Sequence, residues 1–227
     1  MSELIKTAEL YLTVPEYLTR LFRESEYPWQ ILPKIKPFVL DFIKKGNLGY
    51  SEIRDGVLVG DGTKISDFAV IEPPCIIGKN CEIRAGAFIR GNVIIGDGCV
   101  VGNSTEIKNS ILLDKVEAPH YNYVGDSVLG YRSHMGASAI CSNLKSDKKN
   151  VVVHGIKDYE TGLRKVGAFL GEGVEIGCGS VLNPGTVVGI FSSAYPLTSL
   201  RGIYPSRSII KDTKTVVKKN FDKDIFL

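Results

Sequence analysis

The sequence predicts a mainly β protein that is built from stacked six-residue repeats. Ten consecutive hexapeptides place an aliphatic residue at the same position: Val59, Ile65, Ile71, Ile77, Ile83, Ile89, Ile95, Val101, Ile107 and Leu113. A strict period of six differs from the period of about 3.6 of an α-helix and of about 2 of an ordinary strand. A smaller residue often lies two positions earlier, as Ala69, Cys75 and Cys81 do. Each hexapeptide therefore reads as a short strand with one inward face, followed by a turn.

This period resembles that of the hexapeptide-repeat acyltransferases. It runs through residues 57–116 and returns at Leu170, Ile176, Leu182 and Val188. The resemblance implies the fold of that family, a left-handed parallel β-helix of triangular cross-section with three hexapeptides in each coil. We expect the β-helix to span residues 51–190, with an inserted loop near residues 144–165. Residues 191–227, where the rhythm is lost, are expected to form an extended tail with a final strand at residues 208–211.

The first 50 residues lack the period and are expected to be helical. Thr13 is a candidate N-terminal cap of a first helix, and Pro15 would then lie in the first turn of that helix. A second helix is expected at residues 37–45, closed by Gly46. Both segments have apolar faces that need a cover. We expect residues 1–50 to be a helical cap that packs on the first coil or on a neighbouring subunit.

Composition and charge narrow the classes of function. A formal charge of +3, without a dense run of lysine and arginine, argues against a nucleic-acid partner. No apolar stretch has the length needed to span a membrane, so no membrane partner is expected. The five cysteines, an odd number, and the absence of a signal-like start predict reduced thiols in a cytoplasmic protein.

With three hexapeptides per coil, residues 18 apart stack in columns, and one column contains Glu72, Arg90 and Lys108. Two neighbouring cations ~4.8 Å apart repel by about 1 kcal/mol in water, so an anion that lies against Arg90 and Lys108 is favoured. Alternatively, both side chains extend into solvent from an exposed turn, and Glu72 offsets their charge. The spacing leaves both interpretations open.

The repeat breaks at residues 117–126, where Pro119 takes the aliphatic position. One of the three histidines of the chain, His120, lies in this break. Violations of an otherwise consistent pattern are enriched at functional sites. A neutral imidazole can accept a proton near neutral pH, as a general base must, although a lone histidine is more often structural.

Around the break, the sequence resembles the acetyltransferase domain of the bifunctional glucosamine-1-phosphate N-acetyltransferases/UDP-N-acetylglucosamine pyrophosphorylases. Order and spacing agree without gaps from Arg90 to Lys149. The matching residues are Glu106, Lys108, Ala118, Pro119, His120, Tyr123, Gly125, Asp126, Gly130, Gly136, Ala137, Ile140, Asn143 and Lys149. The resemblance implies that His120 is the general base that takes a proton from the sugar 2-amine as the amine attacks acetyl-CoA.

The same resemblance implies the substrate-binding residues. Arg90, Lys108 and Lys149 match the cations that contact the sugar phosphate in that family. Tyr123 and Asn143 match residues that orient the sugar and its amine. The column selects Arg90 and Lys108 independently.

The residues expected to bind acetyl-CoA match the family less well. The backbone near Ala137 is a candidate donor to the thioester oxygen. The family serine that contacts the acyl donor corresponds to Glu172, beside Gly171, and a carboxylate is poorly placed near the phosphates of the coenzyme. His134 replaces a family asparagine that faces the sugar or the acyl donor, so we expect it in the substrate site.

No metal is expected. His120, His134 and His154 are 14 and 20 residues apart and lack the close histidine pair of hexapeptide-repeat carbonic anhydrases. Three hypotheses follow. The chain is a homotrimeric N-acetyltransferase that uses acetyl-CoA and an amino-sugar 1-phosphate, with pockets between subunits. Alternatively, it is a non-catalytic module that binds a sugar phosphate or sugar nucleotide, or it is a scaffold that only trimerises.

Overall fold

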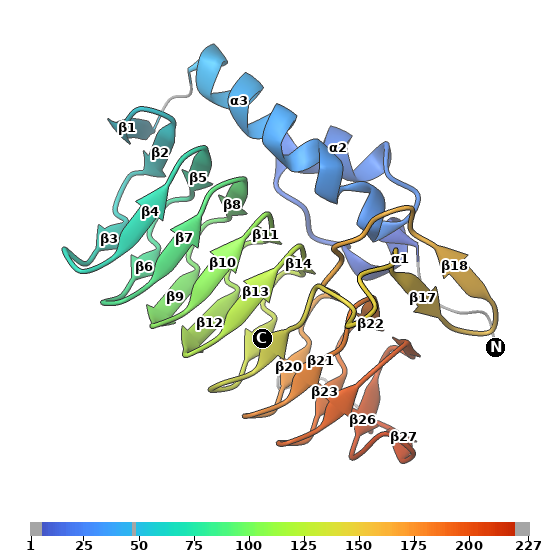
Figure 1. Cartoon of the computed structure of the whole chain (residues 1–227). Coiled ribbons are helices and arrows are strands. Elements are labelled where there is room, and N and C mark those ends of the chain that lie inside the picture. The colour runs from blue at the N-terminus through green and yellow to red at the C-terminus, as the bar shows by residue number, and fades with distance from the viewer. Residues whose placement is uncertain (1–5, 47–48, 221–227) are drawn as a thin grey trace.

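The computed structural model describes residues 6–46 and 49–220, and most of them form a stack of coils (Figure 1). Each coil contributes a short strand to each of three sheets, and strands of successive coils pair in register. This is the left-handed parallel β-helix that the resemblance to the hexapeptide-repeat acyltransferases implies, with about nine turns. We number the sheets 1, 2 and 3 in the order in which the chain reaches them. The corners between them are corner 1–2, corner 2–3 and corner 3–1.

The three sheets contain almost all of the strands. Sheet 1 consists of β1 (Tyr50–Arg54), β2 (Val57–Gly60), β5 (Cys75–Ile77), β8 (Val93–Ile95), β11 (Ile111–Leu112), β14 (Val128–Leu129), β19 (Ala168–Leu170), β22 (Thr186–Val188) and β25 (Ile203–Tyr204). Sheet 2 consists of β3 (Lys64–Ile65), β6 (Glu82–Ile83), β9 (Val100–Asn103), β12 (Glu117–His120), β15 (His134–Met135), β20 (Glu175–Ile176), β23 (Ser193–Ala194), β26 (Ser208–Ile210) and β27 (Val216–Lys218). Sheet 3 consists of β4 (Val70–Glu72), β7 (Phe88–Arg90), β10 (Glu106–Lys108), β13 (Tyr123–Gly125), β16 (Ile140–Cys141), β21 (Val181–Leu182) and β24 (Ser199–Leu200). Within these sheets only β1 and β27, at the two ends, pair antiparallel.

The predicted aliphatic positions line the interior of the coils as far as Ile107. After that residue the repeat loses one position. Leu112 packs inside the coil, whereas the predicted Leu113 belongs to the cluster that faces the N-terminal helices. Ile95 and Leu112, which pair, are consequently 17 residues apart instead of 18. The pattern could not locate this shift, because Ile111, Leu112 and Leu113 are all aliphatic.

In the next coil, Ala118 takes the interior position opposite Val101, and Pro119 does not, contrary to the prediction. A Cβ on Gly102 would lie 1.4 Å from the carbonyl oxygen of Pro119, so only glycine fits there. His120 pairs with Asn103 at the end of β12. The break therefore begins before Pro119, in the shortened corner between Ile107 and Leu112.

The segment before the coils is helical, as predicted, but it lies along the side of the β-helix (Figure 1). Its elements are α1 (Thr7–Leu10), the 3₁₀ turn η1 (Glu16–Leu18), α2 (Thr19–Arg23), the 3₁₀ turns η2 (Pro28–Gln30) and η3 (Leu32–Lys34), and α3 (Ile35–Lys45). The helix predicted at residues 37–45 is α3, and it ends at Gly46, which has a φ of 66°. The segment covers several coils of sheet 1 and not only the first coil, and its packing on a neighbouring subunit stays a prediction.

The outward face of sheet 1 explains this placement. Residues of six strands on that face are buried under the N-terminal segment: Ile76, Ile94, Ile111, Val128, Phe169 and Val187. Burying a large aliphatic or aromatic side chain contributes about 1.5–3 kcal/mol, so a column of six needs a cover. The period of six reports only on the inward positions, so it does not predict this second apolar column.

The insertion at residues 144–165 leaves the coils at corner 3–1, between β16 and β19. It contains the antiparallel hairpin of β17 (Val152–His154) and β18 (Asp158–Glu160). The ring of Tyr159 in this hairpin lies 6.2 Å from that of Trp29, between ring centroids. The insertion therefore packs against the N-terminal segment as well as against the coils.

The coils continue past residue 190, where we expected a tail. Strands β23, β24, β25 and β26 pair in register with the preceding coil. The strand expected at residues 208–211 is β26, but it is not the final one, because β27 follows it. Four residues keep the interior positions: Ala194, Leu200, Tyr204 and Ile210. In the part of the chain that the structure describes, no helix is long and apolar enough to cross a lipid bilayer.

Candidate functional site

Corner 3–1 holds most of the residues that were expected to bind the substrate. Strands β7 and β10 end there with Arg90 and Lys108. The register aligns Glu72, Arg90 and Lys108 in one column, as their spacing predicts. Neighbouring members of such a column lie ~4.8 Å apart. The side chain of Arg90 is 40% exposed and that of Lys108 is 24% exposed, so solvent reaches both cations.

Each of these cations has a carboxylate partner, which the spacing argument missed. Nη1 of Arg90 donates to Oε1 of Glu106 at 2.7 Å, and Nζ of Lys108 donates to Oδ2 of Asp126 at 3.3 Å. The hydrogen bond that Arg90 donates to Glu106 raises the pKa of Arg90. With Glu72 in the column, three carboxylates lie beside two cations. The column therefore has no excess of positive charge.

Asp126 is the centre of the polar network at this corner. Its side chain is 5% exposed and accepts hydrogen bonds from Nζ of Lys108, from Nδ2 of Asn109 at 2.8 Å, and from Nδ2 of Asn143. Asn143 also donates to the hydroxyl of Tyr123 at 3.2 Å. Burial, and next the charge of Asp126, raises the pKa of Tyr123, so its hydroxyl stays protonated at neutral pH. The structure thus brings Tyr123, Asn143 and Lys108 together.

His120 lies at another corner, corner 2–3. Its imidazole is exposed and makes no hydrogen bond or ion pair with residues 6–46 or 49–220. Its backbone is fixed, because its N–H donates to Oδ1 of Asn122 at 3.1 Å and its carbonyl accepts from the N–H of Ser138 at 2.9 Å. Asn122 is 2% exposed, and its Nδ2 donates to the carbonyls of Gly136 and Ala139 at 2.8 and 3.2 Å. Asn122 is thus a positioning residue that the sequence analysis did not single out, although it lies in the break.

The three residues expected to bind the acyl donor do not come together within one chain. Ala137 lies at corner 2–3, one coil beyond His120. Gly171 and Glu172 follow β19 and lie at corner 1–2. Oε2 of Glu172 accepts the backbone N–H of Thr13 at 3.1 Å. Glu172 therefore anchors the N-terminal segment to the coils.

His134 and Lys149 lie apart from the network around Asp126 and from His120. His134 is on the outer face of sheet 2, where Nδ1 lies 3.1 Å from Oε2 of Glu175, its partner in register. The hydrogen bond to Glu175 raises the pKa of His134. Lys149 is exposed in the insertion, and its backbone N–H donates to Oδ1 of Asp147 at 3.0 Å. Within the described residues, no hydrogen bond or ion pair joins either side chain to Asp126.

The expected site residues therefore occupy all three corners of the prism. A site that uses both His120 and Asn143 must extend across the outer face of sheet 3 or include a second copy of the chain. Among residues 6–46 and 49–220, no three or more His, Cys, Asp or Glu side chains gather as metal ligands would.

Comparisons with known proteins place the coils in a family. The profile of a family described as the GMPPB C-terminal domain matches residues 71–190, more than half of the chain. The bifunctional protein GlmU of Methanococcus aeolicus is 36% identical over 166 residues, which cover 71% of this chain and 40% of that protein. The bifunctional sugar-1-phosphate nucleotidylyltransferase/acetyltransferase of Sulfurisphaera tokodaii is 37% identical over 92 residues, which cover 40% of this chain and 23% of that protein. The chain thus spans less than half the length of these two relatives.

The solved structures that the comparison finds are more distant in sequence. A crystal structure of a perosamine N-acetyltransferase variant from Caulobacter crescentus, in complex with CoA and GDP-perosamine, is 15% identical and matches with a TM-score of 0.36. The match covers 70% of this chain and 57% of that chain.

Proposed function

We propose that the chain, which belongs to the family of the GMPPB C-terminal domain, is an N-acetyltransferase. It would transfer acetyl from acetyl-CoA to the amine of an amino-sugar 1-phosphate such as glucosamine 1-phosphate. The observation that supports this most is the 36% identity with a bifunctional protein GlmU, which covers 71% of the chain. The gathering of Tyr123 and Asn143 around Asp126 supports an acceptor site at corner 3–1.

His120 is the proposed general base. It accepts a proton from the amine as the nitrogen attacks the thioester carbonyl; the C–N bond forms, the C–S bond breaks, and the sulfur leaves as the thiol of CoA after it takes up a proton. A positioned base contributes about 10²- to 10⁴-fold. The amide of Ala137 has no acceptor among the described residues, whereas that of Ser138 donates to His120. The Ala137 amide is therefore free to donate to the oxyanion that develops on the thioester.

Asn143 is suited to orient the acceptor amine. Its Nδ2 donates to both Asp126 and Tyr123, and turning the amide group around would lose the bond to Asp126 and set Oδ1 against that carboxylate. This fixes Oδ1 as the group that remains available, and an amide oxygen accepts a hydrogen from an amine. An amine held in this way keeps its lone pair directed away from Asn143 and toward the acyl donor.

We further propose that the site is completed between copies in a homotrimer, because His120 and Asn143 lie at different corners. Exposed apolar side chains follow corner 2–3: Phe68 is 78%, Tyr121 is 61% and Leu197 is 84% exposed. Exposed apolar side chains along one edge are typical of a surface that another protein covers. In a closed trimer, corner 2–3 of one copy would meet corner 3–1 of the next.

The test is the release of CoA thiol from acetyl-CoA in the presence of glucosamine 1-phosphate. We expect turnover by the parent protein and by the control His154→Ala, whose imidazole lies in the hairpin 2.9 Å from Asp158. We expect a loss of about 10²-fold or more in His120→Ala at equal folded concentration. Undiminished turnover in His120→Ala would refute the role of this base, and a trimeric parent without turnover would refute the transferase.

A second candidate function is a non-catalytic module that binds a sugar phosphate or sugar nucleotide. One observation favours it: Glu172, expected beside the acyl donor, is engaged with Thr13 of the N-terminal segment. Such a module would bind glucosamine 1-phosphate but neither bind nor cleave acetyl-CoA. Calorimetric titration with each compound separately distinguishes the two functions.

A further inference from the structure

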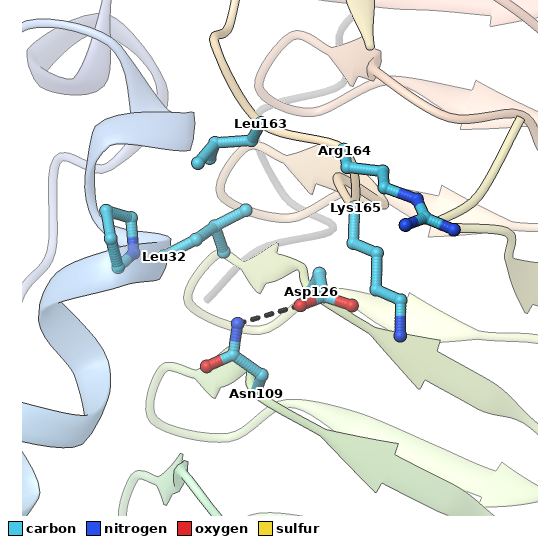
Figure 2. Close-up of a pocket in the computed structure, with 7 residues that line it drawn as sticks. Leu32, Asn109, Asp126, Leu163, Arg164 and Lys165 are labelled. Carbon is cyan, nitrogen blue, oxygen red and sulfur yellow. Dashed lines mark hydrogen bonds between the residues drawn. The ribbon is translucent and has the colours of Figure 1, made fainter. Parts of the chain in front are cut away.

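A cavity of about 400 Å³ opens at corner 3–1, where the coils, the N-terminal segment and the insertion meet (Figure 2). Its lining consists of Leu32, Pro33, Asn109, Asp126, Leu163, Arg164 and Lys165. In Figure 2, Leu32 and Leu163 extend toward each other from opposite sides, and the hydrogen-bonded Asn109 and Asp126 lie below them. A volume of about 300–1,000 Å³ is usual for a small-molecule site. The cavity is thus large enough for a sugar phosphate.

The positive charge at this cavity comes from the insertion. Arg164 and Lys165 are exposed, and neither has an ion-pair partner among residues 6–46 and 49–220. The charge of Asp126 is already offset by Lys108 at 3.3 Å. At the same corner, Arg90 is held by a carboxylate at 2.7 Å. The two cations without partners are therefore the ones that an incoming anion can engage without displacing a partner.

The backbone that follows these cations is tied to the acceptor site. Lys165 forms an antiparallel bridge with Leu144. The N–H of Val166 donates to the carbonyl of Asn143 at 3.0 Å, and the N–H of Gly167 donates to the carbonyl of Asp126 at 2.8 Å. The backbone that carries the two cations is thus fixed next to the residues that are proposed to orient the amine.

We propose that this cavity is the binding site for the phosphate of a phosphorylated sugar, with Arg164 and Lys165 as its cationic contacts. The carbon skeleton of the ligand then lies against the apolar wall of Leu32, Pro33 and Leu163. A phosphate monoester forms charge-assisted hydrogen bonds with both cations and relieves their mutual repulsion. Arg90 and Lys108, which the resemblance implies as phosphate contacts, are the alternative that the experiment tests. The identity of the ligand rests on the proposed function, but the location of the phosphate does not.

The experiment is a calorimetric titration with glucosamine 1-phosphate at low salt and without acetyl-CoA. In Arg164→Ala/Lys165→Ala, we expect affinity to fall by about tenfold or more, since two charge-assisted contacts are lost. The control Lys214→Ala/Lys218→Ala removes two exposed lysines elsewhere and should leave affinity unchanged. Glucosamine, which has no phosphate, should bind the parent and Arg164→Ala/Lys165→Ala equally weakly.

Three results would overturn the proposal. One is equal affinity of the parent and of Arg164→Ala/Lys165→Ala for glucosamine 1-phosphate. Another is a tenfold loss of affinity in Arg90→Ala that does not occur in Arg164→Ala/Lys165→Ala. The third is the absence of parent binding to both glucosamine 1-phosphate and inorganic phosphate at millimolar concentration. Lys165→Glu reverses one charge and should weaken binding more than Lys165→Ala, with melting curves to show that both variants fold. A parent that binds through Arg164 and Lys165 without releasing CoA thiol would support the phosphate site and refute the transferase.

Discussion

Asn122 offers a direct test of how corner 2–3 is built. Its buried side chain satisfies three backbone groups: the N–H of His120 at 3.1 Å, the carbonyl of Gly136 at 2.8 Å and the carbonyl of Ala139 at 3.2 Å. A net hydrogen bond contributes about 1 kcal/mol, and a buried group left without a partner costs about 1–3 kcal/mol. With some relaxation toward water, Asn122→Ala should lower the free energy of unfolding by about 3 kcal/mol.

Asn122→Asp separates hydrogen bonding from shape. The aspartate keeps an oxygen for the N–H of His120, but it directs its second oxygen toward the carbonyls of Gly136 and Ala139, where the amide has a donor. At neutral pH this variant should be less stable than Asn122→Ala, because a buried charge then faces two carbonyl oxygens. The folded state favours the protonated form, so the pKa of this carboxyl is raised in the folded state. The loss of stability should therefore shrink as the pH falls.

Urea unfolding followed by circular dichroism measures these differences. Asn150→Ala, which alters an exposed asparagine of the insertion, is the matched control and should change stability by less than about 0.5 kcal/mol. If Asn122→Ala costs no more than this control, or if Asn122→Asp is as stable as Asn122→Ala at neutral pH, water replaces the three bonds and the reasoning is wrong.

Three further predictions concern other parts of the molecule. Glu175 raises the pKa of His134, so this pair contributes stability that is fully present below the unfolded imidazole pKa of ~6.5 and is lost as the pH rises through the higher folded value. An NMR titration should show a lower His134 pKa in Glu175→Gln, and an unchanged titration would contradict the contact. Glu172→Gln weakens the charge-assisted hydrogen bond from the N–H of Thr13 and should speed proteolysis near Thr13 with little change in overall stability. Equal cleavage rates of the parent and the variant would argue that Glu172 does not anchor the N-terminal segment. Phe169→Ala removes a fully buried ring between sheet 1 and the N-terminal segment. It should lower the free energy of unfolding, measured with urea, by about 3–5 kcal/mol, and a loss below about 1 kcal/mol would contradict this packing.

The fold could be predicted because each coil repeats the same local choice. An inward aliphatic residue every sixth position specifies strand, turn and core together, and this holds from Val59 to Ile107. The prediction was wrong at Leu113 because three consecutive aliphatic residues allow two registers. It found the helices of the N-terminal segment but not their place along sheet 1, since residues such as Phe169 belong to a second, outward apolar face.

The candidate site could be predicted only in part. The column of Arg90 and Lys108 follows from the period alone, and the register confirms it. The carboxylate partners do not follow from it, because neither is the register partner of its cation. Glu106 lies two residues before the position that pairs with Arg90, and Asp126 lies one residue after Gly125, which pairs with Lys108. Pairing distances of this kind depend on side-chain direction as well as on the coil length. Charge balance at a corner is therefore a property of the folded structure.

The separation of His120 and Asn143 leads to a final prediction. They are 23 residues apart, which is one coil plus one further strand, so they must lie at successive corners. If His120 of one copy and Asn143 of the next form each site, mixing the inactive variants His120→Ala and Asn143→Ala restores complete sites. After equal mixing and random reassembly, half of the copies supply His120 and half supply Asn143. About one quarter of the sites is then complete, and about 25% of parent thiol release should return. A site contained within one chain would regain nothing, because every chain in the mixture lacks one of the two side chains.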